Sequence, residues 1–275
     1  TTPLLTMQQH KEYQHIIGLG QWMILCGRID ITYAISSLAR FSAEPREGHL
    51  QYAREVLGYL KKFPKKGIIM DPTVPIIDDG LEEGESKVPE EFKSKDFTHQ
   101  YKYFKEELDP YFPDFKIPEL KITIFSNSDH AHDLITGRSI TGLIAFVGLT
   151  PVYWKSKQQT SVHTSTFGAE FMALKSAVEL AITLRYHLRS MAVKINAPTD
   201  IYVDNKSVCI NSTNPASTLN KKSVALAYHF VRQHQAAKVV SIMHIKSEDN
   251  YADMLTKPLN SNAFRHLVYE FMTNG

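Results

Sequence analysis

Residues 122–142 read ITIFSNSDHAHDLITGRSITG, and this stretch decides the fold. Its pattern predicts a strand, a tight polar turn and the start of a second strand. Side chains two residues apart on a strand point to the same side, so Asn127 and Asp129 are expected to point the same way. The turn has the polar side chains of a metal-binding loop, yet the uncharged Asn127 stands where its first carboxylate is expected.

The segments that follow predict an α/β domain over residues 120–275. SITGLIAFVG (139–148) and TPVYWKSK (150–157) extend the first strand into an antiparallel meander. The later elements are a long helix from Thr166, a strand DIYVD (200–204), two helices, a strand VVSIMHI (239–245) and a final helix opening at SEDNYADML (247–255). This order is typical of a mixed five-stranded sheet flanked by helices.

The two segments before this domain differ from it and from each other. Residues 1–70 predict a small helical unit, because DITYAISSLARF (30–41) and HLQYAREVLGYLKKF (49–63) repeat apolar residues at helical spacing. Residues 71–119 are rich in Pro, acidic and aromatic residues and predict a linker or insertion, partly ordered by its Tyr and Phe side chains. Trp22 and Trp154 are expected in the core.

The net charge of +2 conceals an asymmetry. Residues 71–119 hold 14 acidic and 6 basic side chains, a net charge of −8, which leaves +10 for the rest of the chain. Basic segments beside an acidic one are typical of a protein that faces a polyanion, and equally of a solvated surface. Two cysteines lack the spacing of a disulfide framework or a zinc site and favour a reducing compartment.

Four carboxylates end or begin predicted elements of the α/β domain. They are Asp129 after the first strand, Glu170 at the start of the long helix, Asp204 at the end of a strand, and Asp253 in the final helix. Each alone is more typical of a solvated residue or a helix cap. Carboxylates that converge repel one another unless a divalent cation holds them, and Mg²⁺ or Mn²⁺ prefers such oxygen ligands. A pair of these ions is a known means of phosphodiester hydrolysis.

Several motifs make the chain resemble copia-type (Pseudoviridae) retrotransposon polyproteins. TSTFGAEFMAL, IYVDNKSV, AYHFVR, NYADMLTKPL, VYWKSKQQ and TGRSITG resemble the ribonuclease H domain of that family. YQHIIGLGQWMILCGRIDITYAISSLARF, from Tyr13, resembles the reverse-transcriptase thumb and connection that precede it. The resemblance implies a ribonuclease H-like fold, with Glu170, Asp204 and Asp253 as catalytic metal ligands and a two-metal Mg²⁺ or Mn²⁺ site if that site is intact.

The chain departs from this family in two ways. It has no polymerase palm motif with paired aspartates, so no DNA polymerisation is expected. Alignment through GRSITG places Asn127 on the first metal-binding aspartate of the family. Asparagine is neutral and has one acceptor oxygen and two donor hydrogens, so weaker metal binding and slower cleavage are expected. Asp129 offers a substitute ligand, but it is displaced by roughly 6–7 Å along the strand.

A second group of residues is expected to contact nucleic acid, since most backbone contacts run from basic and hydroxyl side chains to phosphate. Ser165 and Thr166 have an alternative as caps of the long helix. The predicted nucleic-acid-binding residues are Lys155, Lys157, Ser165, Thr166, Asn205, Lys221, Lys222 and Arg232.

Three functions follow. The first is metal-dependent hydrolysis of the RNA strand of an RNA–DNA hybrid, impaired by Asn127. The second is a domesticated or co-opted, catalytically inactive fold that acts as a protein-interaction or nucleic-acid-binding module. The third is a hybrid or double-stranded RNA binder without turnover. No apolar run is long enough to span a membrane. The chain starts at Thr1, as a processed piece would, and a cytoplasmic or nuclear location is expected, with secretion after signal-peptide removal as the alternative.

Overall fold

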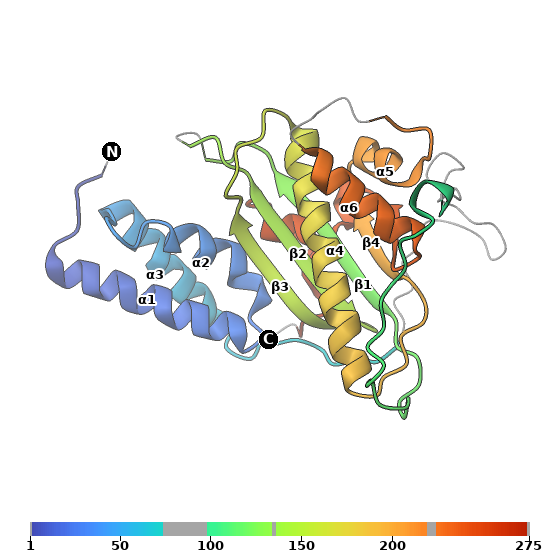
Figure 1. Ribbon diagram of the computed structural model, residues 1–275. Helices are drawn as coiled ribbons and strands as arrows, with labels where there is room; N and C mark the ends of the chain where they lie inside the picture. The colour runs from blue at the N-terminus through green and yellow to red at the C-terminus, as the bar shows by residue number, and fades with distance from the viewer. Residues whose placement is uncertain (1, 74–97, 134–135, 219–223, 274–275) are drawn as a thin grey trace.

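The computed structural model describes residues 2–73, 98–133, 136–218 and 224–273 (Figure 1). Its strands are β1 (Ile122–Asp129), β2 (Ile140–Val147), β3 (Thr150–Gln158), β4 (Thr199–Val203) and β5 (Val240–His244). Its α-helices are α1 (Met7–Leu25), α2 (Thr32–Ala39), α3 (Glu47–Lys62), α4 (Thr166–Ser190), α5 (Lys206–Thr213), α6 (Ala225–Ala236) and α7 (Ser261–Tyr269). Short 3-10 helices are η1 (Ile29–Ile31), η3 (Thr98–Tyr101), η5 (Ser247–Asp249) and η6 (Tyr251–Leu255).

The described strands form one mixed sheet in the order β3-β2-β1-β4-β5. β1, β2 and β3 are an antiparallel meander, whereas β4 pairs in parallel with both β1 and β5. Parallel neighbours need long connections, and these run through α4 from β3 to β4 and through α5 and α6 from β4 to β5. The topology confirms the predicted fold class, a ribonuclease H-like five-stranded sheet flanked by helices.

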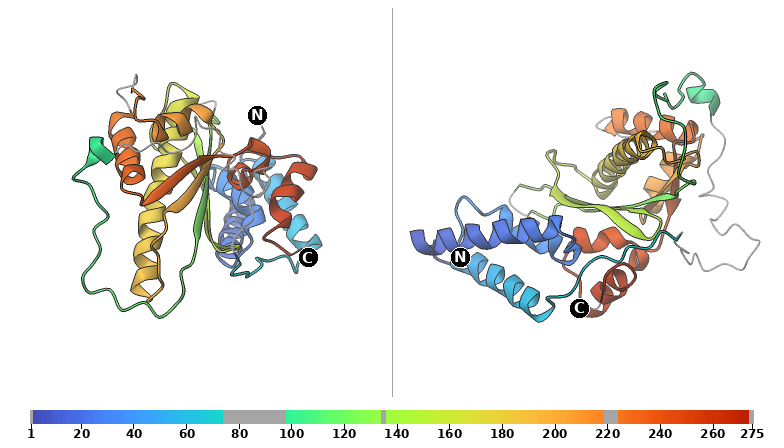
Figure 2. Two further views of the ribbon diagram at one scale, coloured as in Figure 1. Left: turned by 90° about the vertical axis from the view of Figure 1, so that its right-hand side faces the viewer. Right: turned by 90° about the horizontal axis from the view of Figure 1, so that it is seen from below.

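Helices cover both faces of this sheet (Figure 2). On one face, apolar side chains of α4 and α6 pack with Ile124 of β1. On the other, residues of η6 and α7 pack with Phe125 of the same strand. A strand buried on both faces has no polar side to mark it, and β1 is buried from Ile122 to Ser128.

The helices α1, α2 and α3 form a separate apolar cluster beside the sheet, with α2 next to β3 (Figure 1). Arg40, directly after α2, joins this unit to the turn after β1, where its Nη2 lies 2.6 Å from Asp133 Oδ2. The expectation of a core position is wrong for Trp22, whose side chain is 63% exposed on α1. Trp154 is half-buried against the cluster of η6 and α7. The boundaries at residues 70 and 120 stay a prediction.

Residues 98–120 run along α6 and α4 as an extended strap (Figure 1). Phe104 packs on His234 of α6, and Phe112 packs on Tyr186 of α4. The predicted partial order of the acidic segment therefore holds for the strap, while residues 74–97 lie outside the described part. Among the helices described, none combines the length and apolar character needed to cross a membrane.

Candidate active site

Four side chains from distant parts of the chain meet beside the end of β1. Asn127 is on β1, Glu170 is in the second turn of α4, Asp204 follows β4, and Asp253 is on η6. Asn127, Glu170 and Asp253 are only 4, 7 and 6% exposed. The charges of Asp204 and Asp253 both act on Glu170, so the three predicted carboxylates share one electrostatic environment. We call these four residues the acidic pocket.

Gly142 lets η6 approach the sheet closely. It pairs with Asn127 across the β1–β2 ladder. A Cβ atom at this glycine would lie 2.6 Å from the backbone oxygen of Ala252 and 2.7 Å from Cγ2 of Thr256. Any larger residue would therefore push Asp253 away from β1.

Asn250 fixes the position of η6, and sequence reasoning missed it. Its side-chain oxygen accepts the backbone N–H of Ala252, while its Nδ2 donates to the backbone oxygen of Ser126 at 3.1 Å. The residue is fully buried. An Asn directly before an apolar run is a signal for such a cap. The structure also corrects the predicted final α-helix, because Asp253 lies in a 3-10 turn and α7 begins only at Ser261.

Burial and like charge disfavour ionisation in the acidic pocket. Burial, followed by the charges of Asp204 and Asp253, raises the pKa of Glu170 to about 9. Burial also raises the pKa of Asp253, although the ammonium group of Lys257 opposes this shift. Perturbed carboxyl groups that converge in this way are typical of functional sites.

Asn127 makes two hydrogen bonds inside the pocket. Its Nδ2 donates to Oδ1 of Asp253, and its Oδ1 accepts the backbone N–H of Ser128 at 2.6 Å. The second bond assigns the oxygen and nitrogen of the amide, because only an oxygen can accept from a backbone N–H. The residue in the position of the expected first carboxylate is thus a hydrogen-bond donor to another carboxylate.

Asp129 is held by a different partner. Its Oδ2 lies 2.7 Å from Nδ1 of His132, and Tyr33 of α2 stands 3.4 Å from the other ring nitrogen. The Asp129 charge still acts on Asp253, so it lies at the rim of the acidic pocket. Its role as a substitute ligand stays a prediction.

The side chains of the acidic pocket do not fit a divalent cation in this arrangement. Within the described ranges, no three His, Cys, Asp or Glu residues are grouped as metal ligands. Oδ1 of Asp253 accepts from Asn127, and Oδ2 lies 2.7 Å from Nζ of Lys257. Both oxygens of this carboxylate are therefore already bound.

The structure corrects one predicted nucleic-acid contact. Arg232 is 1% exposed, and its guanidinium donates to the backbone oxygens of Asn211, Asn214 and Pro215 and to the side chain of Gln100. It fastens α6 to the segment after α5 and to the strap. A buried arginine with these partners does not reach a nucleic acid.

The remaining predicted nucleic-acid-binding residues differ in exposure and in hydrogen bonding. Ser165 caps α4 by accepting the N–H of Gly168, and Asn205 caps α5 by accepting that of Val208, whereas Thr166 is exposed. On β3, Lys157 is exposed and Lys155 half-buried, where burial and the Lys157 charge lower the pKa of the Lys155 ammonium. Lys221 and Lys222 lie outside the described residues.

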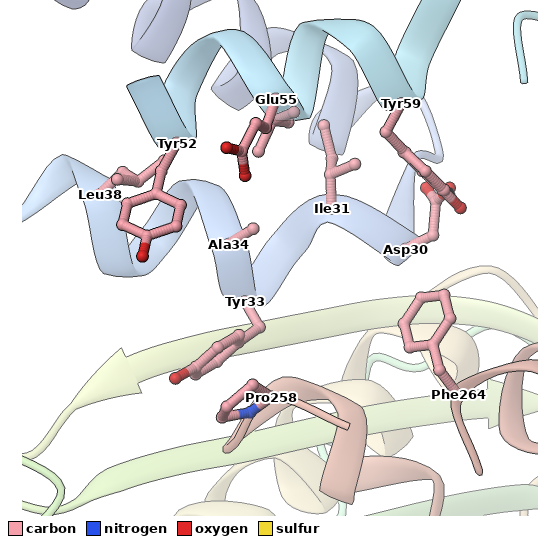
Figure 3. Close-up of a pocket in the computed structure, with 11 residues that line it drawn as sticks. Asp30, Ile31, Tyr33, Ala34, Leu38, Tyr52, Glu55, Tyr59, Pro258 and Phe264 are labelled. Atoms are coloured by element: carbon pink, nitrogen blue, oxygen red, sulfur yellow. Dashed lines mark hydrogen bonds between the residues drawn. The ribbon is translucent and has the colours of Figure 1, made fainter. Parts of the chain in front are cut away.

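A cavity lies away from the acidic pocket, between α2, α3 and the start of α7 (Figure 3). It has a volume of about 640 Å³ and a mainly aromatic and aliphatic wall that includes Tyr33, Tyr52, Tyr59 and Phe264. None of the residues that line it belongs to the acidic pocket. The cavity marks the junction of the helical unit with the sheet.

The fold defines a ribonuclease H-like domain, and its acidic pocket combines Asn127 with three carboxylates. No family model matches the chain. Its homologues are retrovirus-related Pol polyproteins of copia-type transposons. The polyprotein of transposon RE1 from Arabidopsis thaliana is 27% identical over 94% of this chain and 14% of its own length. That of transposon RE2 from the same plant is 25% identical over 97% of this chain and 16% of its own length.

The chain thus spans about one sixth of these curated relatives. Among solved structures, it is similar to LC11-RNase H1 in complex with RNA/DNA hybrid, with 15% identity, a TM-score of 0.40, and coverage of 50% of this chain and 94% of that one. The fold assignment depends on the strand order and helix placement described above.

Proposed function

We propose that this chain is a retroelement-derived ribonuclease H-like domain that binds RNA–DNA hybrids and cleaves their RNA strand poorly. The ancestral reaction is metal-dependent hydrolysis at the acidic pocket. Asn127 is the observation that carries the proposal. It lies near the end of β1, is buried, and donates to Asp253. By the family resemblance, it stands at the position of the first acidic ligand.

The ancestral role of the pocket is supported by its remaining carboxylates. Glu170 and Asp253 are buried and interact electrostatically with each other and with Asp204. Clustering like charges has a cost in folding stability, and such clusters are typical of sites kept for chemistry. The homologous Pol polyproteins support the same origin.

Hybrid binding is supported by charge and by position. Lys155 and Lys157 stand two residues apart on β3, so they point to the same side of this edge strand. The chain outside residues 71–119 carries a net charge of +10. A hybrid that lies across this side would meet ammonium groups suited to its phosphates.

The decisive experiment compares hybrid cleavage by the wild-type chain and by Asn127→Asp in Mg²⁺ and in Mn²⁺. The variant restores the acidic ligand, and we expect its cleavage rate to exceed that of the wild type by on the order of 100-fold or more. Asn262→Asp, an exposed matched change on α7, should cleave like the wild type. Equal rates for wild type and Asn127→Asp, both above background, would contradict the assignment of Asn127.

A second candidate is a fold retained only for binding, with a protein partner if the element has been domesticated. Exposed Leu19, Trp22 and Leu25 on α1 favour it, because large apolar groups that share a surface are typical of protein contacts. It predicts no cleavage by either protein, with hybrid affinity that falls steeply with salt or is absent. Asn127→Asp would then have no effect on the rate.

A further inference from the structure

The carboxylate of Asp253 is bound on both sides by groups of this chain. One oxygen accepts the amide of Asn127 from β1. The other lies 2.7 Å from the ammonium of Lys257, four residues later, and the side chain of Asp253 is only 8% exposed. A buried carboxylate is stable in its charged form only with such partners.

The positive charge of Lys257 acts on more than one carboxylate. Its charge opposes the upward pKa shifts of both Asp253 and Glu170, so it faces the centre of the acidic pocket. Its side chain is 42% exposed, so the ammonium group that is bound to Asp253 also keeps contact with water. A cation at this position reduces the repulsion among Glu170, Asp204 and Asp253.

The amide of Asn127 also reduces the repulsion among the carboxylates. Asparagine supplies a donor to Asp253, whereas an aspartate there would place a second charged oxygen against Oδ1. Repulsion between two carboxylates at hydrogen-bond distance is relieved by a divalent cation between them. The neutral amide removes one negative charge and replaces a repulsive contact with an attractive one.

We infer that the Asn127 amide and the Lys257 ammonium take the place of a divalent cation in this chain, so that the acidic pocket is folded and stable without metal. The inference builds on the proposed function, since it concerns the same pocket. It adds that groups of this chain supply the counter-charge and the hydrogen-bond donor for Asp253. The chain is then a metal-independent protein with the carboxylates of a metal site.

The test is thermal unfolding of the wild-type chain, Asn127→Asp and Lys257→Met, each in EDTA and in millimolar Mn²⁺. A metal that binds only the folded state raises the melting temperature. We expect no shift for the wild type. Asn127→Asp and Lys257→Met should melt several degrees lower than the wild type in EDTA and recover with Mn²⁺, because each leaves Asp253 without one of its partners.

Lys61→Met, on the exposed face of α3, is the matched control, and its melting temperature should equal that of the wild type in both solutions. A second measurement needs no variant. Manganese binding to the wild-type chain, followed by the loss of the electron paramagnetic resonance signal of free Mn²⁺, should be absent at millimolar metal. Binding or stabilisation of the wild type by Mn²⁺ would overturn the inference, and so would a Lys257→Met protein as stable and as metal-insensitive as the wild type.

These results separate the inference from the proposed function. If the wild type binds and is stabilised by Mn²⁺ but cleaves hybrids poorly, only the internal counter-charge is wrong. If the wild type shows no metal stabilisation and Asn127→Asp binds Mn²⁺ without cleaving a hybrid, the inference stands and the catalytic ancestry of the pocket is wrong.

Discussion

The two ends of α4 each hold a buried charged cluster, and the clusters are opposite in character. Near the first turn, Glu170 faces Asp204 and Asp253. Near the last turn, Arg185 and Arg189 both bind Glu106 of the strap, with N–O distances of 2.7–3.0 Å. The same helix therefore carries an acidic pocket at one end and a pair of arginines around a carboxylate at the other, which we call the arginine clamp.

The pKa values of Glu106 and Glu170 differ because the charged groups around the two side chains differ. Burial raises both, but in the arginine clamp the hydrogen bonds and charges of Arg185 and Arg189 outweigh it and lower the pKa of Glu106 to about 2. In the acidic pocket the neighbours are also acids, and the pKa of Glu170 rises to about 9. In the arginine clamp, cationic partners stabilise the charged form of the carboxylate. In the acidic pocket, Glu170 stands among other acids, an arrangement typical of a site kept for function.

The largest change in stability is expected from Glu106→Gln. The substitution leaves two buried guanidinium groups without their carboxylate, and we expect the unfolding free energy at neutral pH to fall by about 3 kcal/mol. Urea unfolding followed by circular dichroism measures the difference. The neighbouring Glu107→Gln, which changes an exposed glutamate, should cost less than about 0.5 kcal/mol. If Glu106→Gln and Glu107→Gln lowered the unfolding free energy equally, the arginine clamp would not stabilise the fold and the contrast between the two ends of α4 would be wrong.

At Glu170, protein stability is expected to decrease as the pH rises. Its folded pKa is raised from 4.5 to about 9, so the folded state holds a proton there that the unfolded state has released. The unfolding free energy should therefore fall by up to about 1.4 kcal/mol per pH unit across this range. Glu170→Gln stays neutral and should remove this slope. Glu179→Gln, an exposed change on the same helix, should leave it intact.

At the arginine clamp, stability should depend on pH in the opposite direction and fall as the solution becomes more acidic. Since the folded pKa of Glu106 is about 2 against 4.5 for a free side chain, its contribution is complete above pH 4.5 and is lost as the pH falls toward 2. The unfolding free energy of the wild type should decrease over that interval, and that of Glu106→Gln should decrease less. Parallel curves for the two proteins would show that Glu106 is not ionised against the arginines.

The smallest effect is expected from Ser165→Ala at the start of α4. Ser165 accepts the N–H of Gly168, and loss of such a cap costs about 1 kcal/mol of stability. Hybrid affinity should not change if the hydroxyl serves the helix alone. Thr166→Ala, at the next and exposed position, should leave stability within about 0.5 kcal/mol. A loss of hybrid affinity in Ser165→Ala at unchanged stability would instead place this hydroxyl against nucleic acid.

Local pattern was sufficient for much of the fold. The apolar residues of β1 and β2, the short connection from β2 to β3 and the long apolar repeat of α4 are properties of neighbouring residues, so each element could be predicted from its own segment. The order of these elements then restricted the sheet to few topologies. Asp253 shows the limit, because the choice between an α-helix and a 3-10 turn depended on Asn250 and its bond to Ser126, 124 residues away.

Among the predicted nucleic-acid contacts, Arg232 is wrong because its partners are remote in sequence. Arg232 is charged and was expected to face nucleic acid, yet Gln100, 132 residues earlier, and three backbone oxygens surround its guanidinium. The exposure of Trp22 was missed for a related reason. Hydrophobic character predicts burial only when another element covers that face, and nothing in the helix itself indicates whether one does.

By itself, the amino-acid sequence determined the fold class and the segments that carry Asn127, Glu170, Asp204 and Asp253, because these depend on residue type and on short-range spacing. Only the tertiary structure decided that both oxygens of Asp253 are occupied by Asn127 and Lys257, and that Arg185 and Arg189 share Glu106. Whether a buried charge is compensated depends on distances of a few ångströms. The groups concerned are far apart in sequence: more than a hundred residues separate Asn127 from Asp253, and about eighty separate Glu106 from Arg185.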